Sequence, residues 1–242
     1  MEKKNFGNDS DSENDEYILE GNCGDSVEIE NNIEQQLLEK AKKAICEILS
    51  TINNKNEIGT GFFCKIHYNN NKNIIKVLFT NNHILNEESL KVGKIINIIY
   101  QGKAKDIKIT NDRLYFTDSR DYKKGLDYSC IEIFDSDEFE DFYEIYIDNL
   151  SNNEIVSING YFNGKELNVQ SGHLKKIKNY KIYHSVQTEH GCSGSPIILT
   201  YRNFNIIGIH RCFIKEKQLN LGSYIIDVLK HINEEKYKGK KK

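Results

Sequence analysis

The stretch EHGCSGSPIIL, residues 189–199, decides the fold and raises the question of function. It holds Pro196, the only proline of the chain, and it places Ser193 in the pattern Gly-x-Ser-Gly-x-Pro beside Cys192. Such a pattern is typical of a nucleophile turn, because glycine allows backbone amides to converge on one oxygen. Either side chain is a possible nucleophile, and the alternative is a glycine-rich turn without chemistry.

The composition limits the classes of protein to consider. A chain of 242 residues is long enough for one large β-rich domain or two small packed lobes, and its net charge of −3 is too small to predict a nucleic-acid partner. No run of 18 apolar residues is present, so no membrane span is expected. The N-terminus lacks the apolar core of a secretory signal, which favours a cytoplasmic location.

The cysteines predict free thiols rather than a disulfide framework or a zinc site. They are scattered without paired spacing, and Cys-x-x-Cys does not occur, so we expect no structural metal and no cofactor. The six cysteines are Cys23, Cys46, Cys64, Cys130, Cys192 and Cys212.

Most of the chain has the pattern of β-strands. Residues 1–30 read as a disordered acidic tail, and a helix of one or two turns is expected before a β-like run at 45–49. Strand-like segments punctuated by Asn and Gly follow, and residues 223–236 predict a C-terminal helix. The stretch 189–199 has strand-like text on both sides, which excludes the strand-to-helix nucleophile turn of α/β-hydrolases. The apolar stripe expected on the C-terminal helix consists of Ile225, Ile226, Leu229 and Ile232.

A serine nucleophile needs a base, and the base needs an orienting acid. His83, at the end of the apolar segment VLFTNNHILN, is the candidate base. Asp127, at the start of the apolar segment in KGLDYSCIEIF, is the candidate acid, because a carboxylate that orients a histidine should be buried. The rival acids stand in polar, loop-like text: Asp106, Asp112, Asp118 and Asp121.

Four motifs in order carry a resemblance to the trypsin-like (chymotrypsin-fold) serine peptidases over residues 44–231: GTGFF at 59–63, FTNNHIL at 79–85, GLDYSCIEI at 125–133 and GCSGSPI at 191–197. The segment LNLGSYI at 219–225 is similar to the last strand of that family. The resemblance implies an all-β fold of two packed six-stranded antiparallel barrels with a C-terminal helix. The implied domain covers 31–235, with the first barrel at about 44–135, the second at about 150–226, the helix at about 223–236 and a basic tail at 237–242.

The resemblance also implies the site. His83, Asp127 and Ser193 would form the catalytic triad, with the amides of Gly191 and Ser193 as the oxyanion hole. Cys192 stands where the digestive enzymes of the family carry the aspartate of their activation switch, and it lacks the following glycine of a nucleophile turn. The missing switch and the missing disulfide beside His83 are similar to the glutamyl-endopeptidase branch. There, a Gly-x-His corresponding to His210 and a threonine corresponding to Thr188 bind a Glu or Gln side chain of the substrate.

The leading hypothesis is therefore a serine endopeptidase that acts on proteins or peptides and prefers Glu or Gln before the cleaved bond. The alternative is an inactive peptidase fold that serves as a protein-binding module. A further expectation is that the enzyme trims its own acidic tail at Glu20, Glu28, Glu30 or Glu34. Four histidines have the context of strand or helix residues and no partner in the sequence: His67, His173, His184 and His231. His190 is near the nucleophile, but its context does not indicate the base. A metal cluster of His184, His190 and Cys192 lacks ligand-like spacing.

Overall fold

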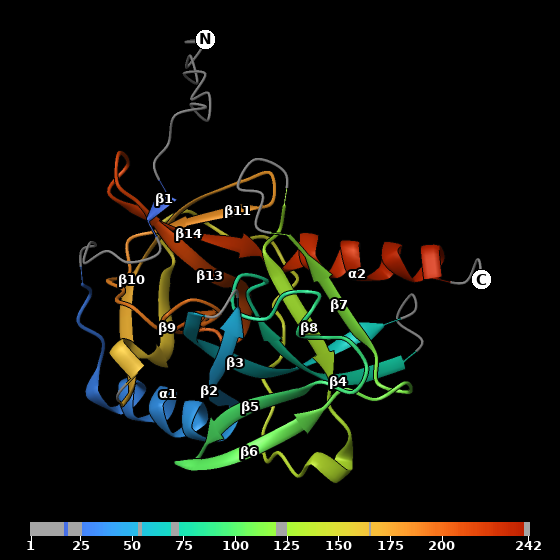
Figure 1. Cartoon of the computed structure of the whole chain (residues 1–242). Helices are drawn as coiled ribbons and strands as arrows, with labels where there is room; N and C mark the ends of the chain where they lie inside the picture. The colour runs from blue at the N-terminus through green and yellow to red at the C-terminus, as the bar shows by residue number, and fades with distance from the viewer. Residues whose placement is uncertain are drawn as a thin grey trace.

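The computed structural model describes residues 17–18, 26–52, 55–68, 73–119, 125–164 and 166–239. Two antiparallel β-sheets lie against each other, and two long helices lie at their margins (Figure 1). This mostly β architecture with a C-terminal helix confirms the predicted fold class.

The C-terminal sheet closes on itself as the sequence predicts. Its order is β13-β12-β9-β10-β11-β14, and β14 pairs back with β13, which makes a closed six-stranded barrel. Closure pairs every strand of the ring with two neighbours, while β12 covers its edge of β13 only over residues 206–209. The strands are β9 (Ile155–Tyr161), β10 (Leu167–Lys178), β11 (Lys181–His184), β12 (Pro196–Leu199), β13 (Ile206–Ile214) and β14 (Leu219–Tyr224).

The N-terminal sheet has seven strands in the order β6-β5-β2-β3-β4-β8-β7, one more than expected. No ladder joins its end strands β6 and β7 within the described part of the chain. The extra strand is β7, whose residues YFTD show no clear alternation of apolar and polar side chains. The strands are β2 (Ile45–Ile52), β3 (Lys55–Tyr68), β4 (Asn73–Thr80), β5 (Ile95–Tyr100), β6 (Lys103–Lys108), β7 (Tyr115–Asp118) and β8 (Tyr128–Glu132).

Alternation along β3 divides the buried side chains between two cores. Phe63 packs into the interior of the N-terminal sheet, whereas Phe62 packs into the core shared with the helices and the C-terminal barrel. Successive strand residues point to opposite faces, so one strand serves both cores. Both rings are fully buried, which stabilises the fold by roughly 2–3 kcal/mol each.

The two helices connect the sheets. Helix α1 (Asn31–Ala44) contacts β9 and β10 of the barrel as well as β2 and β3, and α2 (Ile225–Gly239) contacts β13, β14 and β3. Helix α1 is fourteen residues long, more than the expected turn or two, and passes directly into the extended Ile45. The residues of α2 with the most buried side chains are Ile225, Val228 and Ile232, an i, i+3, i+7 stripe. Ile226 and Leu229 of the expected stripe are only half-buried.

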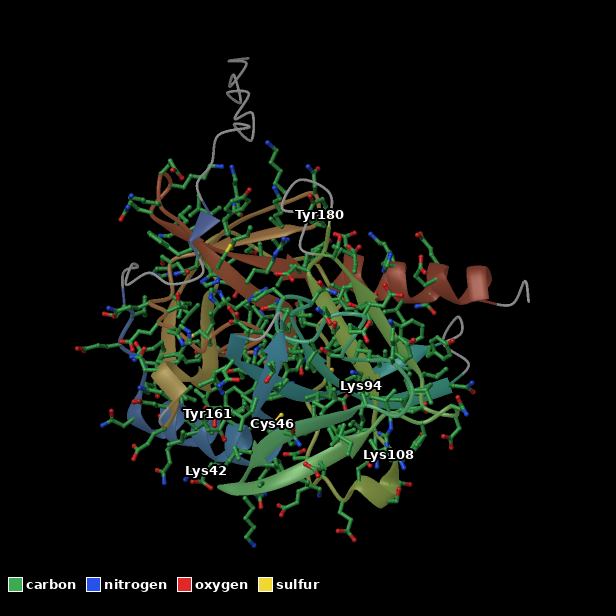
Figure 2. The ribbon with its side chains drawn as sticks, viewed as in Figure 1. Lys42, Cys46, Lys94, Lys108, Tyr161 and Tyr180 are labelled. Carbon is green, nitrogen blue, oxygen red and sulfur yellow. The ribbon has the colours of Figure 1, made fainter. Side chains whose placement is uncertain are left out.

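The sheets meet where β2 runs past β9. Cys46 of β2 and Tyr161 of β9 are labelled at this junction in Figure 2. Burial raises the pKa of Tyr161 to about 12, so its hydroxyl stays protonated at neutral pH. The two sheets therefore meet at a packed contact in which the Tyr161 hydroxyl carries no charge.

Parts of the predicted disordered tail are described. The two-residue strand β1 (Tyr17–Ile18) pairs with β13 on the outside of the ring, and Val27 N donates to Ser171 O at 3.0 Å. The remainder of 1–25 and the basic residues 240–242 lie outside the described residues. Within the described ranges, no helix has the length and the apolar character needed to cross a bilayer.

Candidate active site

The turn between β11 and β12 has a backbone that requires its glycines. Gly191 has φ of +89° and Gly194 has φ of +88°, in the left-handed region. A side chain at either residue would also collide: a Cβ on Gly191 would lie 2.3 Å from Tyr161 O, and one on Gly194 would lie 2.1 Å from Thr60 O. The two glycines of the sequence motif are thus set by space as well as by torsion.

The N–H groups of Gly191 and Ser193 have directions that are set by the carbonyls of the residues before them. The carbonyl of His190 accepts a hydrogen bond from Asn163 N at 2.6 Å, and the carbonyl of Cys192 accepts one from Ser195 N at 3.0 Å. In a planar trans peptide the N–H points opposite to the carbonyl, so these bonds fix the direction of the next amide. Among the described residues neither amide donates a hydrogen bond, and both are available to an oxyanion.

Thr60 holds this turn from the other sheet. Its N–H donates to Ser193 O at 2.8 Å, and its hydroxyl donates to Gly191 O at 2.9 Å. The same hydroxyl oxygen accepts a hydrogen bond from Tyr161 N at 3.1 Å, and Thr60 is fully buried. The sequence motif GTGFF contained Thr60, but no local pattern indicated that it would contact a turn 130 residues away.

His83 and Asp127 lie together beside the turn. His83 follows β4 and Asp127 precedes β8, and because β4 pairs with β8 the two residues meet at the same edge. His83 Nδ1 lies 2.9 Å from Asp127 Oδ2, and His83 N donates to Asp127 Oδ1 at 3.2 Å. Asp127 has φ of +46° and is completely buried, and Asn81 Nδ2 donates to its backbone carbonyl at 2.9 Å. The carboxylate therefore fixes both the orientation and the tautomer of the imidazole.

A buried arginine lies near the same carboxylate oxygen as His83. Arg211 Nε lies 3.6 Å from Asp127 Oδ2, and Arg211 Nη1 donates to Gly125 O at 3.2 Å. Burial alone would raise the pKa of Asp127, but His83 and Arg211 outweigh it and hold this pKa below its usual value. Asp127 is therefore an anion at neutral pH. In the sequence, the position of Arg211 in the mostly apolar segment NIIGIHRCF is the feature that indicates a buried charge.

The Ser193 hydroxyl does not bond to His83 in this structure. It donates to the backbone carbonyl of Arg211 at 3.2 Å, and Ser193 is 8% exposed. His83 Nε2 is buried and has no hydrogen-bond partner among the described residues. The structure thus brings His83 and Asp127 into contact, while the Ser193 hydroxyl is bonded to Arg211 O instead of the imidazole.

Cys192 is an unfavourable nucleophile. It is completely buried, and its Sγ accepts a hydrogen bond from Glu189 N at 3.4 Å. Burial raises the pKa of the thiol, so the reactive thiolate is suppressed. All five cysteines of the described ranges are buried, and Cys23 lies outside these ranges.

The two residues expected to bind the substrate side chain have different partners. His210 Nδ1 lies 3.3 Å from His184 Nε2, and both rings are buried. Thr188 Oγ1 donates to Asn220 Oδ1 at 2.8 Å. His184 was expected to have no partner, and this expectation was wrong, because its contact joins β11 to β13, which are not neighbours in the sequence. A cavity of about 590 Å³ opens beside the turn, but Thr188 and His210 do not line it.

Burial also neutralises these histidines. It lowers the pKa of His184 to about 3 and, with smaller contributions from His184 and His83, it lowers the pKa of His210 well below the usual value. Both imidazoles are therefore neutral at physiological pH.

The rival acids have other roles. Asp118 accepts from Leu126 N at 2.5 Å, and Asp106 accepts from Asn97 Nδ2 at 2.8 Å. Asp121 lies outside the described residues. His231, also expected to have no partner, has its Nδ1 2.8 Å from the hydroxyl of Tyr128. The described residues contain no group of three or more side chains with the arrangement of a metal site.

Comparison with known proteins identifies the fold. No protein-family model matches the chain, and no curated protein matches its sequence. Among solved structures, the active form of the Rv3671c protease of M. tuberculosis matches with a TM-score of 0.61 and 14% identity, covering 90% of this chain and 92% of the other. The serine endoprotease of Yersinia pestis matches with a TM-score of 0.60 and 15% identity, over 84% of this chain and 66% of the other.

A third match is the serine protease of a human pathogenic astrovirus, with a TM-score of 0.50 and 17% identity, over 76% of this chain and 90% of that one. The chain thus has the double-sheet fold of the trypsin-like proteases. At these identities the likeness establishes the fold, and the chemistry has to be argued from the site.

Proposed function

We propose that this protein is a serine endopeptidase with Ser193 as nucleophile, His83 as general base and Asp127 as orienting acid. The observation that carries the proposal is the 2.9 Å contact between His83 Nδ1 and the buried Asp127 carboxylate, beside a turn whose two amides are not used by the protein. This is the arrangement that acyl transfer requires: an oriented base next to preorganised donors for developing negative charge.

In the proposed reaction, His83 Nε2 takes the Ser193 proton as Oγ bonds to the substrate carbonyl carbon. The amides of Gly191 and Ser193 stabilise the oxyanion, and Asp127 stabilises the imidazolium. The C–N bond then breaks, and His83 gives the proton to the leaving amine. A water molecule hydrolyses the resulting ester by the same steps in reverse.

A fluorophosphonate probe tests this proposal, because it bonds only to a serine that an adjacent base activates. We expect labelling of the wild type, none of Ser193→Ala and none of His83→Ala. Cys192→Ala is the matched control on the neighbouring residue and should label as the wild type does. Equal labelling of the wild type and Ser193→Ala would refute the proposal.

We further propose a preference for Glu or Gln before the cleaved bond, supported by the direction of the hydrogen bond between the two buried histidines. His184 Nδ1 has no partner among the described residues. An orphaned buried N–H is rarer than an orphaned acceptor, which favours His184 with its proton on Nε2. Its Nε2–H then donates to His210 Nδ1, and the proton of His210 resides on Nε2.

A neutral Nε2–H on His210 selects a side chain with an acceptor oxygen, so Glu and Gln peptides should both be cleaved. Matched peptides with Glu, Gln, Lys or Phe before the scissile bond measure this preference. His210→Ala should lose the discrimination while still labelling with the probe. A wild type that prefers Lys or Phe would contradict the proposed role of His210.

One observation favours a second candidate, an inactive fold that binds peptides. The Ser193 hydroxyl is bonded to Arg211 O and His83 Nε2 lacks a partner, so the nucleophile is not yet aligned. Apo sites are often loose in this way. A protein that binds peptides but neither labels with the probe nor cleaves them would support this alternative.

A further inference from the structure

The strand next to the proposed nucleophile carries an extended segment of the protein's own N-terminal chain. Strand β1 pairs antiparallel with β13, with Tyr17 opposite Ile214 and Ile18 opposite Phe213. Figure 1 shows β1 against the end of β13. In the sequence, β1 is far from the barrel strands, the first of which begins at Ile155. A strand edge that accepts an extended peptide is a general mode of peptide recognition.

The edge that β1 occupies is the edge at which Ser193 lies. Strand β14 covers one edge of β13 over residues 208–214, so β1 lies on the edge used by β12. Along this edge Gly194 N donates to His210 O, and the Ser193 hydroxyl donates to Arg211 O. The order along one strand edge is therefore β12, the nucleophile turn and then β1.

The direction of β1 is that of a substrate entering the site. Because the pairing is antiparallel, the chain from Tyr17 to Ile18 moves from Ile214 towards Phe213, and hence towards Arg211 and the turn. The two described residues of this segment therefore run along β13 in the direction of the nucleophile turn. Phe213 and Arg211 are two positions apart on β13, a span of roughly 7 Å in an extended strand.

We propose that Tyr17–Ile18 occupy the acyl-side substrate position of the site, and that the protein cleaves its own chain on the C-terminal side of Ile18. This inference rests on the peptidase activity proposed above. The bond between Ser193 Oγ and the substrate carbonyl carbon forms as the C–N bond breaks, and His83 passes the hydroxyl proton to the new amino terminus. Water then hydrolyses the ester and restores Ser193, so the reaction needs no other co-reactant.

The sequence after Ile18 is Leu19-Glu20-Gly21, and residues 19–25 lie outside the described residues. If the preference for Glu holds, the new N-terminus is Gly21. Of the other expected sites, Glu34 lies in helix α1, whose backbone is not extended for cleavage. Cleavage elsewhere between Ile18 and Ser26 would retain the self-processing inference and contradict the Glu preference.

The test follows the full-length protein by intact-mass spectrometry and N-terminal sequencing. We expect the wild type to lose its N-terminal segment at a first-order rate that stays constant over about a hundredfold dilution, because the substrate is tethered. Ser193→Ala should remain intact. Ile18→Pro removes a backbone N–H from β1 and should slow processing at least about threefold. Ser10→Pro, upstream in the same tail, is the matched control and should be processed as the wild type is.

The two proposals fail in different ways. A wild type that labels with the fluorophosphonate probe and cleaves Glu peptides, yet keeps Met1, would overturn self-processing and leave the peptidase proposal intact. Processing whose rate rises in proportion to concentration, or that Ile18→Pro leaves unchanged, would overturn the intramolecular geometry.

A second measurement does not depend on catalysis. In the Ser193→Ala background, hydrogen exchange of the β13 segment 211–214 should be faster with Ile18→Pro than without it, because β1 protects this edge. Equal hydrogen exchange in the two proteins would contradict the claim that β1 covers this edge of β13, whether or not Ser193 is reactive.

Discussion

Lowering the pH should destabilise the fold through the buried histidine pair. His184 is fully buried, and its pKa is lowered from 6.5 to about 3 by burial. In the unfolded chain this histidine binds a proton below about pH 6.5, whereas in the native protein it does not. The unfolded state therefore binds more protons between these values, and the free energy of unfolding falls as the pH falls.

The magnitude follows from the two pKa values. At about pH 5 the unfolded histidine is almost fully protonated and the native one is neutral, so linkage gives a loss of about 2 kcal/mol relative to pH 7.5. The result changes little with the native pKa as long as that pKa is below about 4. His210 adds to the loss in the same direction, because its pKa is also lowered.

Urea unfolding at about pH 7.5 and pH 5 measures this effect in the wild type and in His184→Gln. The variant cannot take up the proton, so its stability should fall by about 2 kcal/mol less between the two pH values. The matched control is His173→Gln on strand β10, a half-buried histidine outside the pair whose Nδ1 lies 3.2 Å from Asn153 O, and it should not reproduce the effect of His184→Gln. Identical pH dependence in His184→Gln and the wild type would refute the argument from burial.

Variants at three other residues test the site. Thr60→Val leaves the carbonyl of Gly191 without its donor, and it should cost about 1–3 kcal/mol in urea unfolding and lower kcat more than it raises KM. Cys192→Ala should retain peptidase activity, and iodoacetamide should not inhibit the wild type, because the thiol is buried and its pKa is raised. Arg211→Met should reduce kcat/KM about tenfold or more, and Arg211→Lys should reduce it less, because the charge beside Asp127 is kept. A Met variant as active as the Lys variant would show that the charge is irrelevant.

The fold class and most strands could be predicted because they depend on local patterns. The C-terminal barrel closes with six strands, as the resemblance implied. Strand β7 was not predicted, because its four residues are all half-buried and show no alternation. The length of α1 was underestimated, since its buried positions include the small residues Ala41 and Ala44, which carry a weak apolar signal.

The sequence predicted those candidate site residues whose neighbours in the sequence distinguish them from other residues of the same type. Asp127 was preferred over Asp118 because of the apolar text that follows it, and Asp127 is the one within 2.9 Å of His83. The sequence could not give the contacts of Arg211, His184 and Thr60, because each joins residues of different strands that only the folded topology brings together. The alignment of the Ser193 hydroxyl was also beyond the motif, since a rotamer is set by neighbours.

The contacts of Thr60 make the nucleophile turn a property of both sheets rather than of the barrel that contains it. A denaturant that loosened the interface would release the Gly191 and Ser193 carbonyls before either sheet lost its own ladders. Reactivity of Ser193 would then report on the docking of the two halves, and inactivation would precede or coincide with unfolding. The proposed activity would be lost when the two sheets separate, while each sheet is still folded.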